Sequence, residues 1–321
     1  MAKIFISTYP FCRSDDTPGR LLKEAGHEIV INPYSRKLKP EEVVDLAMDC
    51  DGVVAGTEEL LPLVEKSKSL KIIARVGVGL DSVPLEMCKS KGIKVAFTPD
   101  AVTPAAAELT IALILNVIRK VSEADRELRK HGWSRPYGTR IGSSVVGIIG
   151  LGRIGSSVAR ILTSFKPPEI LVYDIADCSA KIAEISKMGV NIRQVERKYL
   201  FENSDIVTLH VPRDDGTINS VSTNEFGLMK NSAYLINAAR GGIVDESALL
   251  AALQSGDIAG AAIDVFEEEP YDGPLLSIEN ILLTQHMGSC SNDCRADMER
   301  EACEDIVNYF SGKPLNAEVE L

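Results

Sequence analysis

Three segments in the last third of the chain each place one chemically versatile side chain just after an apolar run. They are Asn237–Glu246 with Arg240, Asp264–Pro270 with Glu269, and Leu282–Ser289 with His286. Each apolar run is typical of a strand buried in a parallel sheet. Because ligands bind beyond the carboxyl ends of such strands, the three side chains are predicted to converge at one edge of a sheet.

An arginine, a carboxylate and a histidine together suit the oxidation of a hydroxyl group beside a carboxylate. Histidine can take up the hydroxyl proton and return it, because its charge changes near neutral pH. A neighbouring carboxylate orients the imidazole and favours its protonated form, while an arginine fork binds a substrate carboxylate and polarises a keto oxygen. Taken singly, each residue has a plainer reading: Arg240 as a surface group, and Glu267–Glu269 as a solvated acidic turn.

A second motif predicts where a dinucleotide binds. The apolar run Ser144–Ile149 leads into Gly150-Leu151-Gly152-Arg153-Ile154-Gly155, and a helix follows. In this G-x-G-x-x-G pattern Gly150 allows the tight turn, Gly152 admits a pyrophosphate to the backbone, and Gly155 lets helix and strand pack closely. Asp174 ends the next strand 19 residues later, near the expected spacing of about 20 for a carboxylate that binds ribose hydroxyls. It favours NAD over NADP, although a solvated strand end is the plainer alternative.

Methyltransferases that use S-adenosylmethionine share this glycine turn and acidic second strand. The downstream Arg240, Glu269 and His286 argue against that class.

These motifs require elements that alternate between strand and helix, and the chain supplies two such series. The first series has predicted strands at Lys3–Ser7, Glu28–Asn32, Gly52–Ala55, Lys71–Val76 and Lys94–Thr98. The second has them at Ser144–Ile149, Ile170–Asp174, Asn191–Val195, Asp205–His210, Ala233–Asn237, Ala259–Asp264 and Ile281–Thr284. One long helix is expected to start near Pro104 and run to Lys130, and Ser291–Ser311 is predicted to be helical.

The predicted fold is therefore α/β, with two doubly wound parallel sheets. A smaller, flavodoxin-like substrate domain is expected to comprise residues 1–99 and 291–321, because the last helix is too short to form a domain alone. A Rossmann NAD-binding domain is expected at residues 100–290.

Composition narrows the class of protein. Among 321 residues, 45% are hydrophobic and 25% charged, and the formal net charge is -11, which excludes wholesale disorder and argues against nucleic-acid binding. Seven scattered cysteines suggest a reducing, cytoplasmic compartment. The most apolar segment, Ile111–Ile118, is shorter than the ~20 residues of a membrane span, so no membrane association is expected. A metal site at His286, Cys290 and Cys294 lacks a fourth ligand, so no metal is expected.

Together these segments resemble the D-isomer-specific 2-hydroxyacid dehydrogenase family, most nearly its phosphoglycerate dehydrogenase branch. The resemblance covers nearly the whole chain and includes Arg75–Asp81. It implies that Arg240, Glu269 and His286 are catalytic. It implies NAD contacts by Gly150, Gly152, Arg153, Ile154, Gly155, Asp174, Val211, Pro212, Thr217, Ala238, Arg240, Asp264, His286 and Gly288. It implies substrate contacts by Arg75, Arg135 and the loop amides of Val76, Gly77 and Val78. A homodimer joined through the nucleotide domains is also implied, with Trp133 and Arg135 near the neighbouring active site.

Departures from the family pattern bear on the substrate. Gln285 stands before the histidine where the family usually has proline. The stretch Ala55–Glu59 is neutral and then acidic, where the phosphoglycerate branch has basic side chains that hold a phosphate. The substrate is therefore expected to be a small anionic D-2-hydroxy acid or 2-keto acid: 3-phosphoglycerate and phosphohydroxypyruvate, or hydroxypyruvate and glyoxylate.

Three further expectations complete the sequence reading. No regulatory domain follows residue 321, so feedback through such a domain is not expected. A formate- or phosphite-like substrate on the same scaffold is one alternative function. An NAD(H)-sensing corepressor that binds peptides is another.

Overall fold

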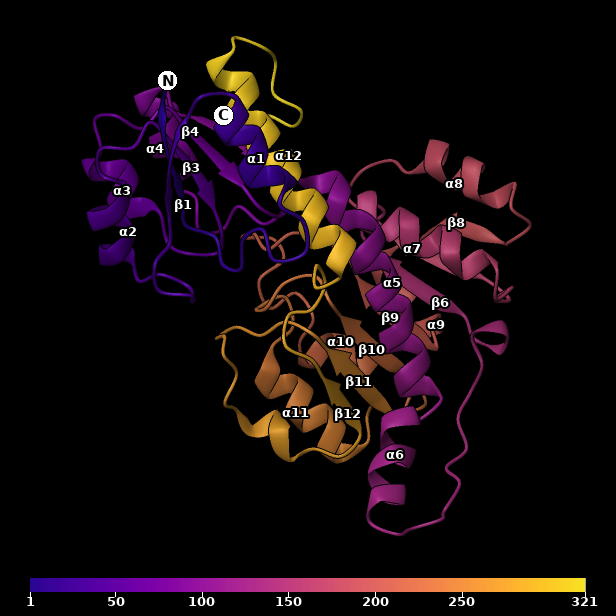
Figure 1. Ribbon diagram of the computed structural model, residues 1–321. Coiled ribbons are helices and arrows are strands. Elements are labelled where there is room, and N and C mark those ends of the chain that lie inside the picture. The colour runs from indigo at the N-terminus through magenta and orange to yellow at the C-terminus, as the bar shows by residue number, and fades with distance from the viewer. Residues whose placement is uncertain (321) are drawn as a thin grey trace. The chain divides into compact units, whose positions relative to one another are not determined.

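The structure is a computed structural model that describes residues 1–320. The chain forms two compact units. Unit 1 comprises Met1–Val102 together with the chain from Ser289 onward, and unit 2 comprises Thr103–Gly288. Figure 1 shows each unit as a sheet with helices on its two faces.

Unit 1 is built on a parallel five-stranded sheet in the order β2-β1-β3-β4-β5. The strands are β1 (Lys3–Ile6), β2 (Glu28–Ile31), β3 (Gly52–Ala55), β4 (Ile72–Arg75) and β5 (Lys94–Phe97). The helices are α1 (Thr17–Glu24), α2 (Pro40–Ala47), α3 (Leu61–Lys66), α4 (Leu85–Lys91) and α12 (Asn292–Phe310). Apolar residues of α2, α3 and α4 bury one face of the sheet, and α12 packs beside α1 along β3 and β4. This is the flavodoxin-like order, as predicted.

Unit 2 is built on a parallel seven-stranded sheet in the order β12-β11-β10-β9-β6-β7-β8. The strands are β6 (Val146–Ile149), β7 (Ile170–Tyr173), β8 (Ile192–Gln194), β9 (Ile206–Leu209), β10 (Tyr234–Asn237), β11 (Gly260–Ile263) and β12 (Ile281–Leu283). The helices are α6 (Val121–Arg129), α7 (Arg153–Thr163), α8 (Ser179–Ser186), α9 (Arg197–Asn203), α10 (Thr223–Leu228) and α11 (Glu246–Ser255), with 3₁₀ turns at Ile141–Ser143 and Pro274–Ser277. The strand order reverses at β6, which is the doubly wound nucleotide-binding arrangement. The predicted fold class is thus confirmed.

Alternating side chains of the unit 2 strands feed two separate apolar layers. Val146 and Ile148 of β6 pack with residues of α5 (Pro99–Ile118), α7 and α8. Ile149 packs on the other face with Leu200 and Phe201 of α9 and with residues of α10 and α11. Apolar side chains bury both faces of the sheet. A ligand can therefore bind only at the polar ends of the strands.

The helix expected from Pro104 to Lys130 is two helices. Helix α5 runs from Pro99 to Ile118, and Lys120, with a φ of 57°, interrupts the chain before α6. A left-handed residue cannot continue a right-handed helix, and Asn116 accepts the Ser122 N–H across the break at 3.0 Å. The start was misplaced because two prolines, Pro99 and Pro104, both suit a first helical turn.

Helix α5 also corrects the length assigned to the most apolar segment. Its 20 residues include an 18-residue window of mean hydropathy 1.8, enough by length and composition to cross a membrane. Ala107, Ile111, Ile114 and Ile118 of this helix pack against β6 and α7 in one core layer. The core helix of a compact domain satisfies the same length and hydropathy criterion, so this helix is weak support for a membrane span.

Candidate active site

The three loops predicted to carry the chemistry follow adjacent strands. Strands β10, β11 and β12 are neighbours in the unit 2 sheet, and Arg240, Glu269 and His286 lie in the loops beyond their carboxyl ends. A fourth loop, the glycine turn after β6, opens at the same edge because every strand is parallel. The sheet therefore places the predicted catalytic residues and the predicted dinucleotide site along one edge.

His286 and Glu269 are in direct contact. The imidazole Nδ1 lies 2.8 Å from Oε2 and 3.1 Å from Oε1 of Glu269. Burial alone would raise the pKa of Glu269, but the bond to His286, the Phe266 amide and nearby Arg240 hold it below its usual value. A carboxylate that is ionised and bonded to Nδ1 fixes the ring and leaves Nε2 as the nitrogen for proton exchange with a ligand.

Backbone geometry around His286 depends on Asp264, a fully buried carboxylate directly after β11. Its Oδ1 accepts the Thr284 hydroxyl at 2.5 Å and the Met287 N–H at 2.8 Å, and its Oδ2 accepts the Gly288 N–H at 3.1 Å. Its backbone carbonyl accepts the His286 N–H at 2.7 Å. The sequence predicted Asp264 as an NAD contact. In the structure, its carboxylate also holds the His286 loop through these hydrogen bonds.

Arg240 is held by the turn that follows β10. The buried Asn237 donates from Nδ2 to the Arg240 carbonyl at 3.0 Å and accepts the Ala239 N–H at 3.1 Å. A Cβ at Gly241 would lie 1.7 Å from the Phe266 carbonyl oxygen, so only glycine lets this turn pass so close to the β11 loop. Asn237 begins the segment predicted from the sequence, but its positioning role was not predicted, because a strand-end asparagine has no chemical signature of its own.

The glycine turn has the geometry that its pattern predicts. Gly150 has a φ of 91°, and a Cβ there would lie 2.6 Å from the His210 carbonyl oxygen. A Cβ at Gly155 would lie 2.0 Å from the Gly150 carbonyl oxygen, whereas nothing lies within 4 Å of one at Gly152. Two glycines are therefore required by packing, and the third leaves open backbone at the start of α7, where a pyrophosphate fits.

Asp174 lies beside the glycine turn, as the spacing predicts. Its Oδ2 accepts the Leu151 N–H at 2.7 Å, and its Oδ1 accepts the Ala176 N–H at 2.9 Å. A carboxylate offers about four acceptor positions, so acceptor capacity remains for the two hydroxyls of a ribose. Other predicted cofactor contacts border the same turn: Val211 approaches Gly150, and Thr217 bonds the Pro212 carbonyl at 2.7 Å.

A second histidine at this edge has a different environment. Burial lowers the pKa of His210 to about 4, and its Nε2 lies 3.0 Å from the Thr208 hydroxyl. An imidazole that is neutral throughout the physiological range cannot exchange protons there. His210 is thus a packing residue under the glycine turn, where it adjoins Gly150 and Gly155.

The substrate loop predicted in unit 1 needs a correction. The Val76 N–H donates to the Ala55 carbonyl at 2.9 Å, and the Gly77 N–H donates to the Thr98 hydroxyl at 2.8 Å. Those amides support the loop after β4 and are not free for a ligand. The N–H groups of Val78 and Gly79 have no acceptor in residues 1–320, so any anion-binding amides of this loop are these two.

The acidic stretch after β3 also differs from expectation. Glu58, expected to repel a phosphate, is 1% exposed; it accepts the Gly56 N–H at 2.7 Å and the Ser7 hydroxyl. Only Glu59 of the pair is exposed. Arg75 is buried at the end of β4 and donates to the Val76 carbonyl, whereas Arg135 is exposed.

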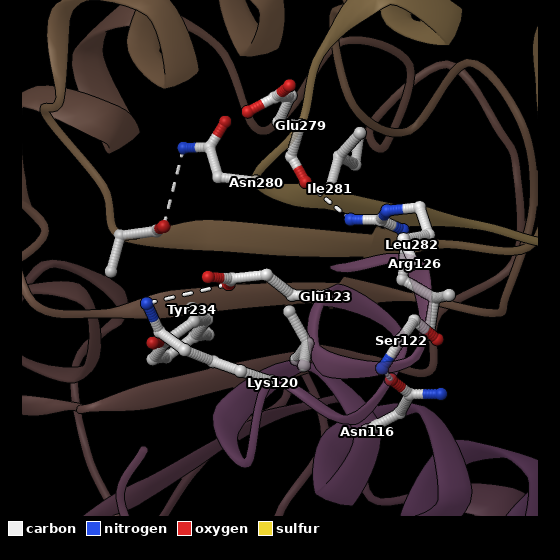
Figure 2. Close-up of a pocket in the computed structure, with 12 residues that line it drawn as sticks. Asn116, Lys120, Ser122, Glu123, Arg126, Tyr234, Glu279, Asn280, Ile281 and Leu282 are labelled. Atoms are coloured by element: carbon white, nitrogen blue, oxygen red, sulfur yellow. Dashed lines mark hydrogen bonds and ion pairs between the residues drawn. The ribbon is translucent and has the colours of Figure 1, made fainter. Parts of the chain in front are cut away.

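A pocket at the opposite edge of the unit 2 sheet is not part of this site. It measures about 50 Å³ and includes Tyr234 and Ile281, the first residues of β10 and β12. Figure 2 shows Arg126 bonded to the Glu279 carbonyl, and Lys120 paired with Glu123, across its walls. The Arg126 contact fastens α6 to the loop that leads into β12, whereas the Lys120–Glu123 pair lies at the first turn of α6. Among residues 1–320, no group of three or more metal-ligating side chains is found anywhere.

The fold and the glycine turn define a class of dinucleotide-binding α/β protein, and at the same sheet edge a histidine contacts a glutamate. Residues 111–288 match the D-isomer specific 2-hydroxyacid dehydrogenase, NAD binding domain. The chain belongs to this family, and its cofactor is NAD. The resemblance of the sequence to the family is thereby confirmed.

The relatives that match this chain have about one third of the aligned residues identical to it. D-3-phosphoglycerate dehydrogenase from Archaeoglobus fulgidus is 36% identical over 263 residues, covering 81% of this chain and 49% of that protein. Glyoxylate reductase from Thermofilum pendens is 36% identical over 303 residues, covering 91% and 88%. The chain spans about half the length of the phosphoglycerate dehydrogenases that it matches.

Among solved structures, an NADPH-dependent glyoxylate/hydroxypyruvate reductase from Sinorhizobium meliloti is similar over 99% of this chain and 98% of its own. The TM-score is 0.84 and the sequence identity is 29%.

Proposed function

We propose that the protein interconverts a D-2-hydroxy acid and its 2-keto acid, with NAD as the hydride carrier. The observation that carries this proposal is the 2.8 Å bond between His286 Nδ1 and Glu269 Oε2, beside the Arg240 loop and on the same sheet edge as the glycine turn. This combination supplies a proton carrier, a carboxylate to orient it and a cation for an anionic substrate.

In the oxidation direction, His286 Nε2 accepts the proton of the substrate hydroxyl. Glu269 stabilises the imidazolium that forms and holds the ring in place. Arg240 binds the substrate carboxylate and polarises the oxygen that becomes the keto group. Bound NAD supplies the hydride acceptor for the hydrogen that leaves C2. In reduction, the protonated His286 returns its proton to the keto oxygen.

Unit 1 is proposed as the substrate domain. The Val78 and Gly79 amides suit a substrate carboxylate, because two adjacent N–H donors without acceptors form a concave anion site. The inward-turned Glu58 and exposed Glu59 leave no cation after β3 for a phosphate. We therefore favour a substrate with an uncharged tail, hydroxypyruvate or glyoxylate, over phosphohydroxypyruvate.

The test is NADH oxidation with hydroxypyruvate, glyoxylate, phosphohydroxypyruvate and branched 2-keto acids, and NAD reduction with formate and phosphite. We expect the highest kcat/KM with hydroxypyruvate or glyoxylate, and higher kcat/KM with NADH than with NADPH because Asp174 disfavours a 2′-phosphate. Activity with formate or phosphite alone would replace this proposal by the alternative substrate class. No turnover with any acid, together with peptide capture, would favour the corepressor alternative.

A cytoplasmic homodimer is the proposed working form. Helix α6 buries none of its residues within the chain, and Trp133 and Tyr137 in the following arm are 79% and 93% exposed. Exposed aromatic side chains of this kind are typical of interface cores. Sedimentation velocity of the parent and of a Trp133→Ser, Tyr137→Ser double variant measures the assembly; a monomeric parent would contradict it.

A further inference from the structure

The glycine turn is held from two sides at one buried residue, Leu151. Its N–H donates to Asp174 Oδ2 at 2.7 Å. Its carbonyl oxygen accepts from Lys181 Nζ, also at 2.7 Å. Asp174 directly follows β7, and Lys181 is the third residue of α8. Two side chains of opposite charge therefore fix the two peptide groups that flank Leu151.

The contact with Lys181 determines the direction of the next N–H group. In residues 1–320 the cis peptide bonds are Tyr9–Pro10 and Glu269–Pro270, so the Leu151–Gly152 peptide is trans. In a trans peptide the C=O and N–H point in opposite directions. The Gly152 N–H is thus directed away from Lys181. It has no acceptor in residues 1–320, and nothing lies within 4 Å of a Cβ built at Gly152.

We propose that Lys181 is a positioning residue for the pyrophosphate of the dinucleotide. Its ammonium fixes the Leu151–Gly152 peptide so that the Gly152 N–H faces the open start of α7, where phosphate groups bind. A charged donor on the carbonyl also polarises the peptide, which strengthens the N–H as a donor. Lys181 acts through the loop and rests on the NAD site; it is independent of the identity of the acid substrate.

The experiment compares Lys181→Met with Lys187→Met. Lys187 lies at the end of the same helix and is exposed, so its variant makes the same change in net charge without touching the turn. Dissociation constants for NADH come from fluorescence titration, and those for ADP and adenosine come from competition against NADH. Lys181→Met is expected to weaken NADH and ADP about 5- to 20-fold, the effect of one charge-assisted hydrogen bond. Adenosine binding and kcat at saturating NADH are expected to change less than twofold.

Lys181→Arg keeps a cation at this position and is expected to bind NADH within about threefold of the parent. Equal NADH affinity in Lys181→Met and Lys187→Met would overturn the proposal. Equal weakening of ADP and adenosine, with a lowered melting temperature, would also overturn it, since that pattern marks a general structural role. A parent that binds no NADH would contradict the NAD site itself, and the two failures are thereby distinguished.

Discussion

At the residue scale, the two histidines at this sheet edge differ in their surroundings. His210 lies under the glycine turn with a pKa of about 4 because it is buried. His286 has a half-exposed side chain, a left-handed φ of 53° and an ionised carboxylate on Nδ1. The two histidines therefore have different environments, and we propose that only His286 exchanges a proton with the substrate.

Replacing His286 by asparagine is expected to lower kcat by at least ~10²-fold, the loss typical of a general acid–base. NADH affinity should stay within about threefold, since the dinucleotide contacts at the glycine turn are unchanged. Steady-state kinetics and NADH titration measure the two effects. His131→Asn, at an exposed histidine of the arm, is the control; a His286→Asn enzyme within tenfold of the parent would refute the assignment.

A second residue-scale prediction concerns Glu269 and the pH dependence of kcat/KM. Its pKa is held below the usual value by His286, the Phe266 amide and Arg240, against the effect of burial, so it stays ionised and favours the imidazolium. In Glu269→Gln the charged partner of His286 is lost, and keto acid reduction is expected to fall off at a lower pH than in the parent. The pH profile of kcat/KM is the measurement, with Glu268→Gln as control. An unshifted profile would mean that Glu269 does not act on His286.

At the element scale, buried polar residues at strand ends hold the loops that carry the predicted site residues. Asn237, the last residue of β10, bonds two groups of the loop that follows it, and Asp264, directly after β11, bonds groups of the His286 loop. A buried carboxylate is tolerated only where donors satisfy it, and the loop donors meet that requirement. Each of these two loops is therefore tied by hydrogen bonds to a buried polar residue at a strand end.

Asp264→Asn is expected to reduce the free energy of unfolding by about 2–3 kcal/mol. An amide Nδ2 would replace an acceptor that faces backbone N–H donors and leave one of them unsatisfied. Turnover should fall by about 10- to 100-fold, because small displacements of a catalytic group are costly. Urea unfolding and kcat test this against Asp257→Asn, an exposed residue before the same strand. Parent-like values for both quantities would show that Asp264 does not hold the His286 loop.

A second set of element-scale contacts holds residues 316–319 against α12 and β5 of unit 1. Asp305 of α12 is fully buried; its Oδ1 accepts the Asn316 N–H at 2.6 Å, and its Oδ2 has no partner in residues 1–320. The segment beyond it pairs with β5, where Val319 donates to Val95 at 2.8 Å. Burial raises the pKa of Asp305 from 3.8 to about 6. The folded protein therefore holds this proton more tightly than the unfolded chain does.

The raised pKa of Asp305 determines how the free energy of unfolding changes with pH. Stability from Asp305 is present below about pH 4 and is lost as the pH rises to about 6, a loss on the order of 3 kcal/mol. Asp305→Asn should remove that slope and increase stability at pH 7.5 by about 1–3 kcal/mol. Urea unfolding from pH 4.5 to 8 tests it, with the exposed Glu320→Gln as control. Equal slopes in parent and Asp305→Asn would contradict the prediction.

At the scale of the whole molecule, the net charge of -11 makes local cations decisive for an anionic substrate. Arg75 is buried at the end of β4, and Arg135 lies exposed in the arm that follows α6. In Figure 1 that arm and α6 project from the body of unit 2. A cation on a projecting arm is suited to serve a second copy of the chain.

Use of a phosphorylated substrate is therefore expected to depend on Arg135. Arg135→Ala should lower kcat/KM for phosphohydroxypyruvate at least tenfold, since a bidentate arginine–phosphate contact is lost, and change hydroxypyruvate less than threefold. The two kcat/KM values, measured in parent and variant, give the answer, and Lys130→Ala controls for charge in the arm. A strong phosphate preference that survives in Arg135→Ala would place the phosphate cation elsewhere.

The sequence by itself determined the strands of this protein and the segments that meet at one sheet edge. Short runs of four to six residues between helical stretches located the strands found in residues 1–320, because parallel strands covered on two faces are mostly apolar; the edge strand β8, with Arg193 and Gln194, is the polar exception. The spacing from Gly150 to Asp174 and the three strand-end motifs indicated the glycine turn, its acidic partner and the residues Arg240, Glu269 and His286, since local backbone requirements leave a trace in residue type.

Only the tertiary structure decided which polar groups already have hydrogen-bond partners within the protein. Val76 and Gly77 read as ligand amides until the neighbouring strand and Thr98 are seen to accept their protons. Glu58 read as a repelling surface charge, although it is turned inward to Ser7 and Gly56. Lys181 carries no motif, yet it holds the Leu151 carbonyl. Such pairings join residues that are distant in the chain, so residue type and local spacing do not encode them.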